Sequence, residues 1–450
     1  MRIKSEKINY VLFFILIVSF VFPINLATGL TNSGIVVLYL ANFIYIYFFI
    51  YNLIQIIRRI NKLDHKTKEL VAVYFLIGIE YIFITVVRFL SKQYYYKSFV
   101  MCFWIVMPLS LFFLVINKNI DRKKFLITLY YSMSTINILS IIYHLFIARA
   151  FKTEFLGNVN IVIFCALIGL ILNILYGIEI KNKKSILIIF NFAYYIFIVS
   201  ISGSRAGFII GSLAVLGVVL YSVIVKRLKK EIILGLLIGT FISFISIISN
   251  FYYSRDLFFR GINLSTISSS LDEFSTGNIN IDEINQIMQN ISENNTENDE
   301  KKQQEILLYN DVGRLLYWKE AIKEIKKSPL IGTGNITVGD NGQGSGQTAH
   351  NFILEYWLVF GGIGLILWIV YVILVIRNII KINLKHKGRG NIYLIFFFLF
   401  LVCGYSLLQP TMVSSLGPTL VWSMLAVFYS KESNNDSLVT WERGKQVNEE

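Results

Sequence analysis

Residues Val11–Phe22 read VLFFILIVSFVF, and residues Asn391–Val402 read NIYLIFFFLFLV. Neither stretch alternates apolar and polar residues as a strand of a membrane barrel does. Apolar runs of about 17–25 residues recur along the chain, and each can cross a hydrocarbon core about 30 Å thick. Backbone groups in lipid must be hydrogen-bonded within their own segment, so these runs predict transmembrane helices.

The composition of the whole chain agrees with a membrane protein. Of the 450 residues, 55% are hydrophobic and 16% are charged, whereas a soluble domain is about 45–50% apolar and about 25% charged. The net charge of +14 is interpreted as membrane topology, because Lys and Arg collect in cytoplasmic loops, and no nucleic-acid partner is expected. Cys102, Cys165 and Cys403 all lie inside apolar runs, so no disulfide framework is expected.

The sequence therefore predicts an all-α fold, a polytopic transmembrane helix bundle of about 12 spans. The predicted helices are 8–28, 34–57, 70–90, 98–116, 124–147, 156–178, 185–202, 206–225, 231–250, 350–376, 391–409 and 415–430.

These helices divide the chain into four parts. Residues 1–250 form an N-terminal bundle of about nine spans, and residues 350–432 add about three more. Between them lies one large loop, 251–349, and a tail follows at 433–450. The first apolar run is interpreted as a retained helix, since more spans follow it and no small-residue cleavage site is convincing.

Lys and Arg also predict the orientation of the bundle. They are concentrated near both termini and in a set of short connecting segments, which a cytoplasmic location explains. The segments are Arg58–Glu69, Asn117–Lys124, Glu179–Lys184, Lys226–Glu231 and Arg377–Gly390. We therefore expect a multi-pass protein of the cell membrane with both termini in the cytoplasm and the loop 251–349 outside.

The large loop has two kinds of sequence. Residues 271–305 are rich in Asn, Asp, Glu and Ser, a composition typical of mobile segments. Residues 311–328 instead carry helix start and stop signals, with Asp311 at the beginning and Pro329 just after the end. This helix is predicted to be amphipathic and to lie against the membrane surface or the outer mouth of the bundle. Its apolar face comprises Leu315, Trp318, Ala321, Ile322 and Ile325.

Two arginines and one histidine on the outer side are candidate functional residues. Arg314 falls on the apolar face of the predicted loop helix, where a guanidinium needs a partner or a ligand, unless its stem packs and its head reaches water. Arg205 lies in a tight turn between two spans, where its planar fork suits a phosphate oxyanion; an ordinary loop arginine is the alternative. His350 precedes a predicted helix, and a helix N-terminus favours a neutral, proton-accepting imidazole, although a structural histidine is the commoner case.

Two charged residues lie inside a predicted span. Glu80 is in the middle of 70–90, and Arg88 lies two turns further along on roughly the same face. Ionisable residues within the membrane are candidate site residues, although a structural ion pair explains these two equally well. No His, Cys and carboxylate cluster has the spacing of a metal site, and the glycine-rich stretch at 339–346 lacks the Lys-Ser or Lys-Thr of a P-loop. We expect neither a metal nor a cofactor.

Short motifs also follow one another in a distinctive order on the predicted outer side. They are GNVN at 157–160, SGSRAG at 202–207, GRLLYW at 313–318, SPLIGTG at 328–334, HNFIL at 350–354 and GGIG at 361–364. In this order they resemble the O-antigen polymerase and ligase superfamily, the Wzy/WaaL-type membrane glycosyltransferases. One departure is Val159, which stands where that superfamily usually has a proline.

The resemblance implies a GT-C-like helical bundle and a reaction at its outer face. A glycan would pass from an undecaprenyl-pyrophosphate carrier to an acceptor hydroxyl, with inversion and without a metal. Arg205 and Arg314 match the positions of the two arginines that bind the pyrophosphate, and His350 matches the position of the base. Asn160 and Asn351 are expected to line the site.

Several alternatives remain open. Capsule or exopolysaccharide repeat-unit polymerases and O-antigen ligases share these motifs; the abundance of Ile, Asn and Lys favours a polymerase, since it suggests a low-GC genome and a cell with a single membrane. A flippase of the same pathway would be expected to have repeated halves and short loops. A structural or sensory protein would leave Arg205, Arg314 and His350 unexplained. The expected partners are the lipid bilayer, a lipid-linked oligosaccharide, and a flippase and chain-length regulator of the pathway.

Overall fold

The computed structural model of the protein describes most of the apolar runs and parts of the connections. The described residues are 2–21, 25–31, 34–90, 106–116, 120–142, 159–180, 184–201, 204–225, 229–249, 317–334, 337–338, 347–385, 389–407 and 416–429. The predicted mobile stretch 271–305 and Arg314 lie outside these residues, as do Cys102 and the tail 433–450.

The all-α prediction is confirmed, because each predicted span has a helical counterpart. The helices are α1 (Arg2–Val21), α2 (Leu40–Arg59), α3 (His65–Leu90), α5 (Met107–Ile116), α6 (Arg122–Ile142), α7 (Val159–Glu179), α8 (Ser185–Ile201), α9 (Arg205–Val225), α10 (Lys229–Ile248), α15 (Phe352–Lys385), α16 (Arg389–Ser406) and α17 (Leu416–Tyr429). Within the described residues, seven helices are long and apolar enough to cross a membrane, so the protein is a multi-pass membrane protein.

The first two predicted helices have different bounds in the structure. The chain between α1 and α2 forms an antiparallel hairpin of strands β1 (Asn25–Thr31) and β2 (Gly34–Tyr39). The prediction extended helices to residue 28 and from residue 34, which is wrong for this stretch. Short apolar runs such as Gly34-Ile-Val-Val suit a strand as well as a helix, because β-branched residues pack well on a pleated surface.

Contacts between distant segments bring the predicted cytoplasmic loops together at one end of the bundle. Arg122, at the start of α6, forms a two-pronged ion pair with Glu179, at the end of α7, with both N–O distances at 2.6 Å. Arg377, near the end of α15, pairs with Glu69 near the start of α3 at 2.8 Å. We call this the basic end; its location on the cytoplasmic side stays a prediction.

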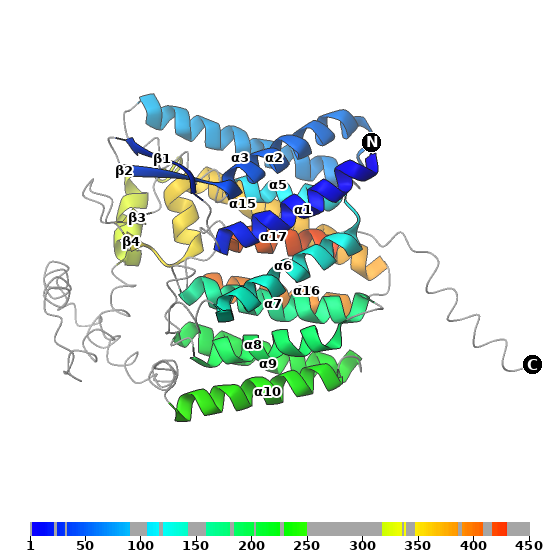
Figure 1. The fold of residues 1–450 in the computed structure, drawn as a ribbon. Helices are drawn as coiled ribbons and strands as arrows, with labels where there is room; N and C mark the ends of the chain where they lie inside the picture. The colour runs from blue at the N-terminus through cyan, green and yellow to red at the C-terminus, as the bar shows by residue number, and fades with distance from the viewer. Residues whose placement is uncertain are drawn as a thin grey trace, which may run out of the picture.

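Chain direction then places other segments at the opposite end. Because α7 and α15 reach the basic end late in their length, their first residues lie at the other end, and β2 leads directly into α2 there. The second hairpin, β3 (Thr337–Val338) with β4 (Gln347–Thr348), also precedes α15. Figure 1 shows both hairpins at the end of the bundle that is opposite the N-terminus. We call this the hairpin end.

The helices of the bundle lie side by side, with α2 and α3 on one flank and α10 on the other (Figure 1). Helix α10 packs mainly against α8. Added Cβ atoms at Gly235 and Gly239 would meet Phe192 and the backbone of Ala193, so two glycines four residues apart let these helices approach closely. The opposite face of α10 exposes large apolar side chains, such as Leu237 and Phe241, that suit lipid.

Within the predicted loop helix 311–328, residues 317–327 are helical. Ala321 and Ile325 are buried in a small cluster with Ala349 and Leu358 of the following segment. The helix therefore lies against the start of α15, at the mouth of the bundle. Ile322 departs from the predicted apolar face, since 45% of it is exposed; its position on the wheel is at the margin of the face that packs.

Candidate functional site

Helix α15 is broken one-quarter of the way along its length. Gly361 has φ of 68° and ψ of −175° inside an otherwise helical segment, a conformation essentially restricted to glycine. The helices on either side are 352–360 and 362–385. A break of this kind frees two N–H groups and two carbonyl groups that helical bonding would have joined, and freed groups inside a membrane protein need new partners.

Residues 329–334 supply those partners, and we call this segment the strap. In an unbroken helix, the N–H groups of Gly362 and Ile363 would donate to the carbonyls of Leu358 and Val359. Instead, backbone groups of the strap form hydrogen bonds with these two N–H groups and these two carbonyls. The bonds are Gly362 N–H to Pro329 O (2.8 Å), Ile363 N–H to Leu330 O (3.2 Å), Gly334 N–H to Val359 O (3.1 Å) and Thr333 N–H to Leu358 O.

Side chains reinforce the strap at both of its ends. The indole N–H of Trp357 donates to the carbonyl of Pro329 at 2.9 Å. The hydroxyl of Thr333 donates to the carbonyl of Leu358 at 3.0 Å. Gly332 and Gly361 meet at the centre, both with positive φ. A Cβ on either residue would overlap the backbone of the other segment. Gly332 of SPLIGTG and Gly361 of GGIG therefore meet in one backbone contact.

His350 lies immediately before α15, in a turn stabilised by its neighbour. Its φ is 52°, and it is the one residue other than glycine with positive φ among the described residues. Such a conformation costs about 1–3 kcal/mol and is found disproportionately at functional sites. Asn351 caps α15, because its side-chain oxygen accepts from the N–H groups of Ile353 (3.0 Å) and Leu354 (3.3 Å). The structure thus gives Asn351 a capping role beside His350.

Tyr317 is a neighbour of His350 that the sequence prediction missed. The two rings are nearly parallel, at 24°, with centroids 6.3 Å apart. Half-burial of Tyr317 raises the pKa of its hydroxyl, since desolvation disfavours the phenolate. The tyrosine is therefore neutral and can donate a hydrogen bond at the hairpin end. Its position one turn after Arg314 on the predicted helix was the available signal.

Glu355 is a second residue that the prediction missed. It lies in the first turns of α15 and is fully buried. Neither of its carboxylate oxygens has a hydrogen-bond partner among the described residues. A single acid in the apolar run that follows His350 was the sequence signal for it.

Arg205 begins α9 at the hairpin end. Ser204 caps this helix, accepting from the N–H of Gly207 through its side chain (3.1 Å) and from that of Phe208 through its carbonyl (2.8 Å). A Cβ on Gly207 would overlap Ile163 of α7, so the starts of α7 and α9 lie close together. Asn160 belongs to the first turn of α7 and therefore lies near the start of α9. Helix α16 packs against both α9 and α15.

Glu80 lies where α3 packs against α15. A Cβ on Gly364 would lie 2.8 Å from both carboxylate oxygens, so the acid is directed at the helix just past the break. These oxygens have no hydrogen-bond partner among the described residues. The side chain of Arg88 lies outside the described part, as does all of Arg314, so a structural ion pair between Glu80 and Arg88 stays an alternative to a role in the site.

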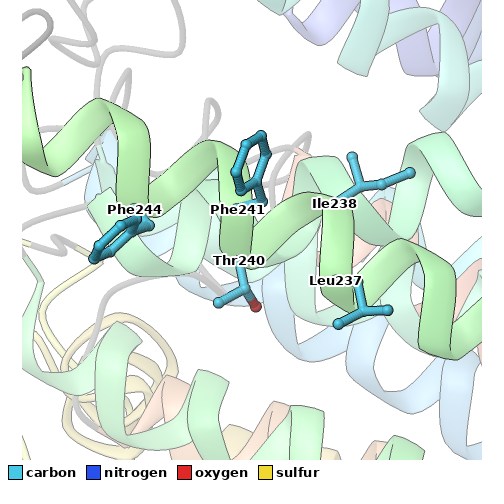
Figure 2. A pocket seen from close by; sticks show the side chains of 5 residues that line it. All are labelled: Leu237, Ile238, Thr240, Phe241 and Phe244. Carbon is cyan, nitrogen blue, oxygen red and sulfur yellow. The ribbon is translucent and has the colours of Figure 1, made fainter.

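A shallow groove on α10 is lined by Leu237, Ile238, Thr240, Phe241 and Phe244. Figure 2 shows these side chains along one helix. The lining has a single hydroxyl and no charge, so it offers lipid contact and no chemistry. Within the described ranges, no group of three or more His, Cys, Asp and Glu side chains is arranged to hold a metal ion; independence from metals stays a prediction.

The comparison with protein families matches the region that contains these features. Residues 190–369 match the family model Wzy_C, described as O-antigen ligase. The match begins within α8 and extends through Arg205, the strap and His350 to a point in α15 past the break. A comparison with curated proteins gave no match. Over residues 190–369 the chain is therefore similar to the O-antigen ligase family, which supports the resemblance to the O-antigen polymerase and ligase superfamily.

Proposed function

We propose that this protein polymerises a polysaccharide at the hairpin end of its helix bundle. The donor is a glycan on undecaprenyl pyrophosphate, and the acceptor is a hydroxyl of a second lipid-linked repeat unit. The reaction inverts the anomeric centre, needs no metal, and occurs on the extracytoplasmic side of the cell membrane. The proposal assigns the catalytic base to His350 and pyrophosphate binding to Arg205 and Arg314. In this scheme residues 1–250 and 350–432 hold the lipid.

The chemistry follows from these assignments. His350 accepts the proton of the acceptor hydroxyl as its oxygen attacks the anomeric carbon. The bond from that carbon to the pyrophosphate breaks, and the pyrophosphate leaves with the bonding electrons. Arginine suits the leaving group because its planar fork binds phosphate oxygens in pairs and remains charged. Asn160 at the start of α7 can add a polar contact.

One observation carries the proposal: His350 has a strained positive φ at the N-terminus of α15, at the same end of the bundle as Arg205. The helix N-terminus favours an imidazole without a positive charge, as proton acceptance requires. It also favours a nearby anion, and the starts of α7, α9 and α15 all face this end. Helix ends that converge on one side suit a pyrophosphate better than a neutral sugar.

The test is transfer activity of purified variants in lipid with a lipid-linked repeat unit. His350→Ala is expected to lower the rate about 10²–10⁴-fold, as loss of a general base does. Arg205→Ala is expected to lose about 1.5–3 kcal/mol of transition-state binding, the value of a charged hydrogen bond. His65→Ala is the matched control, because that imidazole is 87% exposed at the basic end. Full activity in His350→Ala would refute the assignment.

A second candidate is ligation of the glycan to a different acceptor, which the description O-antigen ligase favours. The two reactions differ in what they require. A polymerase extends the lipid-linked repeat unit when that is the sole substrate, giving a ladder of products. A ligase leaves it unextended until another acceptor is added. The absence of a ladder from active, folded enzyme would exclude polymerisation.

A further inference from the structure

Residues 317–327 form a short helix at the hairpin end, which we call the mouth helix. One face of it is buried, because Ala321 and Ile325 pack against Ala349 and Leu358. Figure 1 shows the mouth helix running across the end of the bundle, beside the labels β3 and β4, while the spanning helices run lengthwise. A helix with this direction at the end of a transmembrane bundle lies parallel to the bilayer and close to its surface.

The opposite face of the mouth helix combines lysines with an aliphatic side chain. Residues three or four apart on a helix are neighbours, and the exposed residues follow this spacing. They are Lys319, Ile322, Lys323 and Lys326. Ile322 is 45% exposed, and Leu330, in the strap that follows, is 64% exposed. A basic face that also exposes apolar side chains is typical of helices that lie in a membrane interface.

The charges on this face do not cancel. Each of the two carboxylates of the mouth helix pairs with one lysine, Glu320 with Lys323 at 3.4 Å and Glu324 with Lys327 at 2.5 Å. Within the part of the chain that the structure describes, neither Lys319 nor Lys326 has an ion-pair partner. The exposed face therefore keeps a net positive charge that complements an anion.

We propose that this face docks on anionic lipid headgroups at the bilayer surface. The ammonium groups of Lys319 and Lys326 contact headgroup phosphates, and Ile322 and Leu330 enter the boundary between headgroups and acyl chains. An anionic glycan would match the charge but offers no apolar surface to the two aliphatic side chains. Docking also fixes the level of the strap, and of the break in α15, relative to the lipid. The inference goes beyond the proposed reaction and does not depend on the role of His350.

The first test measures which lipid lies beside the mouth helix. A fluorophore is attached to Ile322→Cys in the full chain, with the three native cysteines replaced by alanine. The protein is reconstituted in phosphatidylcholine with a minor fraction of phosphatidylglycerol, and one lipid or the other carries a quenching nitroxide near the top of its acyl chain. Phosphatidylglycerol is expected to be enriched about five-fold for each unpaired lysine. Quenching in proportion to the mole fractions overturns the proposal.

Two double variants show whether the enrichment belongs to this face. Lys319→Gln with Lys326→Gln is expected to remove it. Lys66→Gln with Lys68→Gln is the matched control, because it removes the same charge from exposed lysines at the start of α3, at the basic end. The control is expected to leave the quenching unchanged. Equal loss of enrichment in both double variants contradicts docking through the mouth helix.

The second test separates lipid from glycan as the partner. Acrylamide, a neutral quencher dissolved in water, is added to the labelled protein in vesicles, with and without alginate as a soluble anionic polysaccharide. Weak quenching that alginate does not change is expected for a face that lies on lipid. Strong quenching by acrylamide overturns the proposal, and if alginate abolishes that quenching, the partner is an anionic glycan instead.

Discussion

The packing of α8 against α10 and the insertion of the strap into α15 both depend on pairs of glycines, but the two regions use them differently. Between α8 and α10, Gly235 and Gly239 bring two regular helices together, and the contact is made of side chains and carbonyls from continuous helices. In the strap, Gly332 and Gly361 let two irregular backbone segments exchange hydrogen bonds.

The two glycine pairs serve different purposes: one allows two helices to pack closely, and the other shapes the region around the candidate site. A regular membrane helix satisfies its own backbone, so close packing of α8 and α10 needs no special residue beyond the small ones. A broken helix is tolerated in a membrane protein where other protein groups satisfy it or where it lines a cavity. The break in α15 sets the direction of residues 352–360, and that short helix carries His350, Asn351 and Glu355 at or near its start.

Gly361→Ala is expected to have the largest effect in this comparison. Its Cβ would overlap the strap backbone, and alanine does not adopt φ of 68° with ψ of −175° without strain. The expected cost is about 3 kcal/mol or more in unfolding free energy, with loss of transfer activity. Thermal unfolding in detergent and the transfer assay measure both.

Gly362→Ala is the control for that substitution, since its Cβ would lie 3.2 Å from the Pro329 carbonyl and 3.8 Å from the Trp357 ring nitrogen. A small adjustment accommodates it. If the two alanine variants have equal melting temperatures, the strap does not depend on the backbone conformation of Gly361.

Gly239→Ala is expected to have an intermediate effect on stability and little on catalysis. The added Cβ would lie 2.7 Å from the carbonyl of Ala193 and 2.8 Å from Ile196, so α10 must move away from α8. Overpacking of this kind costs about 1–3 kcal/mol. The rate per folded molecule should be retained, because the contact is on the flank of the bundle away from α15.

Gly78→Ala is the matched control on α3, where nothing lies within 4 Å of the new Cβ. It should leave the melting temperature unchanged or raise it, because alanine favours the helix over glycine. A loss of activity in Gly239→Ala at full folding would mean that the α8–α10 contact also influences the site.

Trp357→Phe is expected to have the smallest effect. It removes the 2.9 Å bond from the indole to the Pro329 carbonyl and keeps an aromatic ring in the cluster with Leu358. A single hydrogen bond contributes about 0.5–1.5 kcal/mol. Comparison of its melting temperature with that of Gly361→Ala would show how much of the strap is held by side chains and how much by backbone.

The site was only partly predictable from the sequence. His350 and Arg205 could be selected because charged and basic residues at the ends of apolar runs are conspicuous. Glu355 and Tyr317 had weaker signals and were missed, because their importance depends on what lies beside them after folding. The hairpin of β1 and β2 was also missed, since Ile35-Val-Val-Leu38 is compatible with either a strand or a helix until its partner strand is known.

The sequence by itself determined that this chain is a bundle of membrane-crossing helices, because long apolar runs leave the backbone no other way to satisfy its hydrogen bonds in lipid. It also indicated which ends carry basic loops and which motifs share the opposite end. Only the tertiary structure decided that SPLIGTG and GGIG are one contact and that His350 is strained. Hydrogen bonds between segments about 30 residues apart depend on where both segments lie, and local sequence does not specify that.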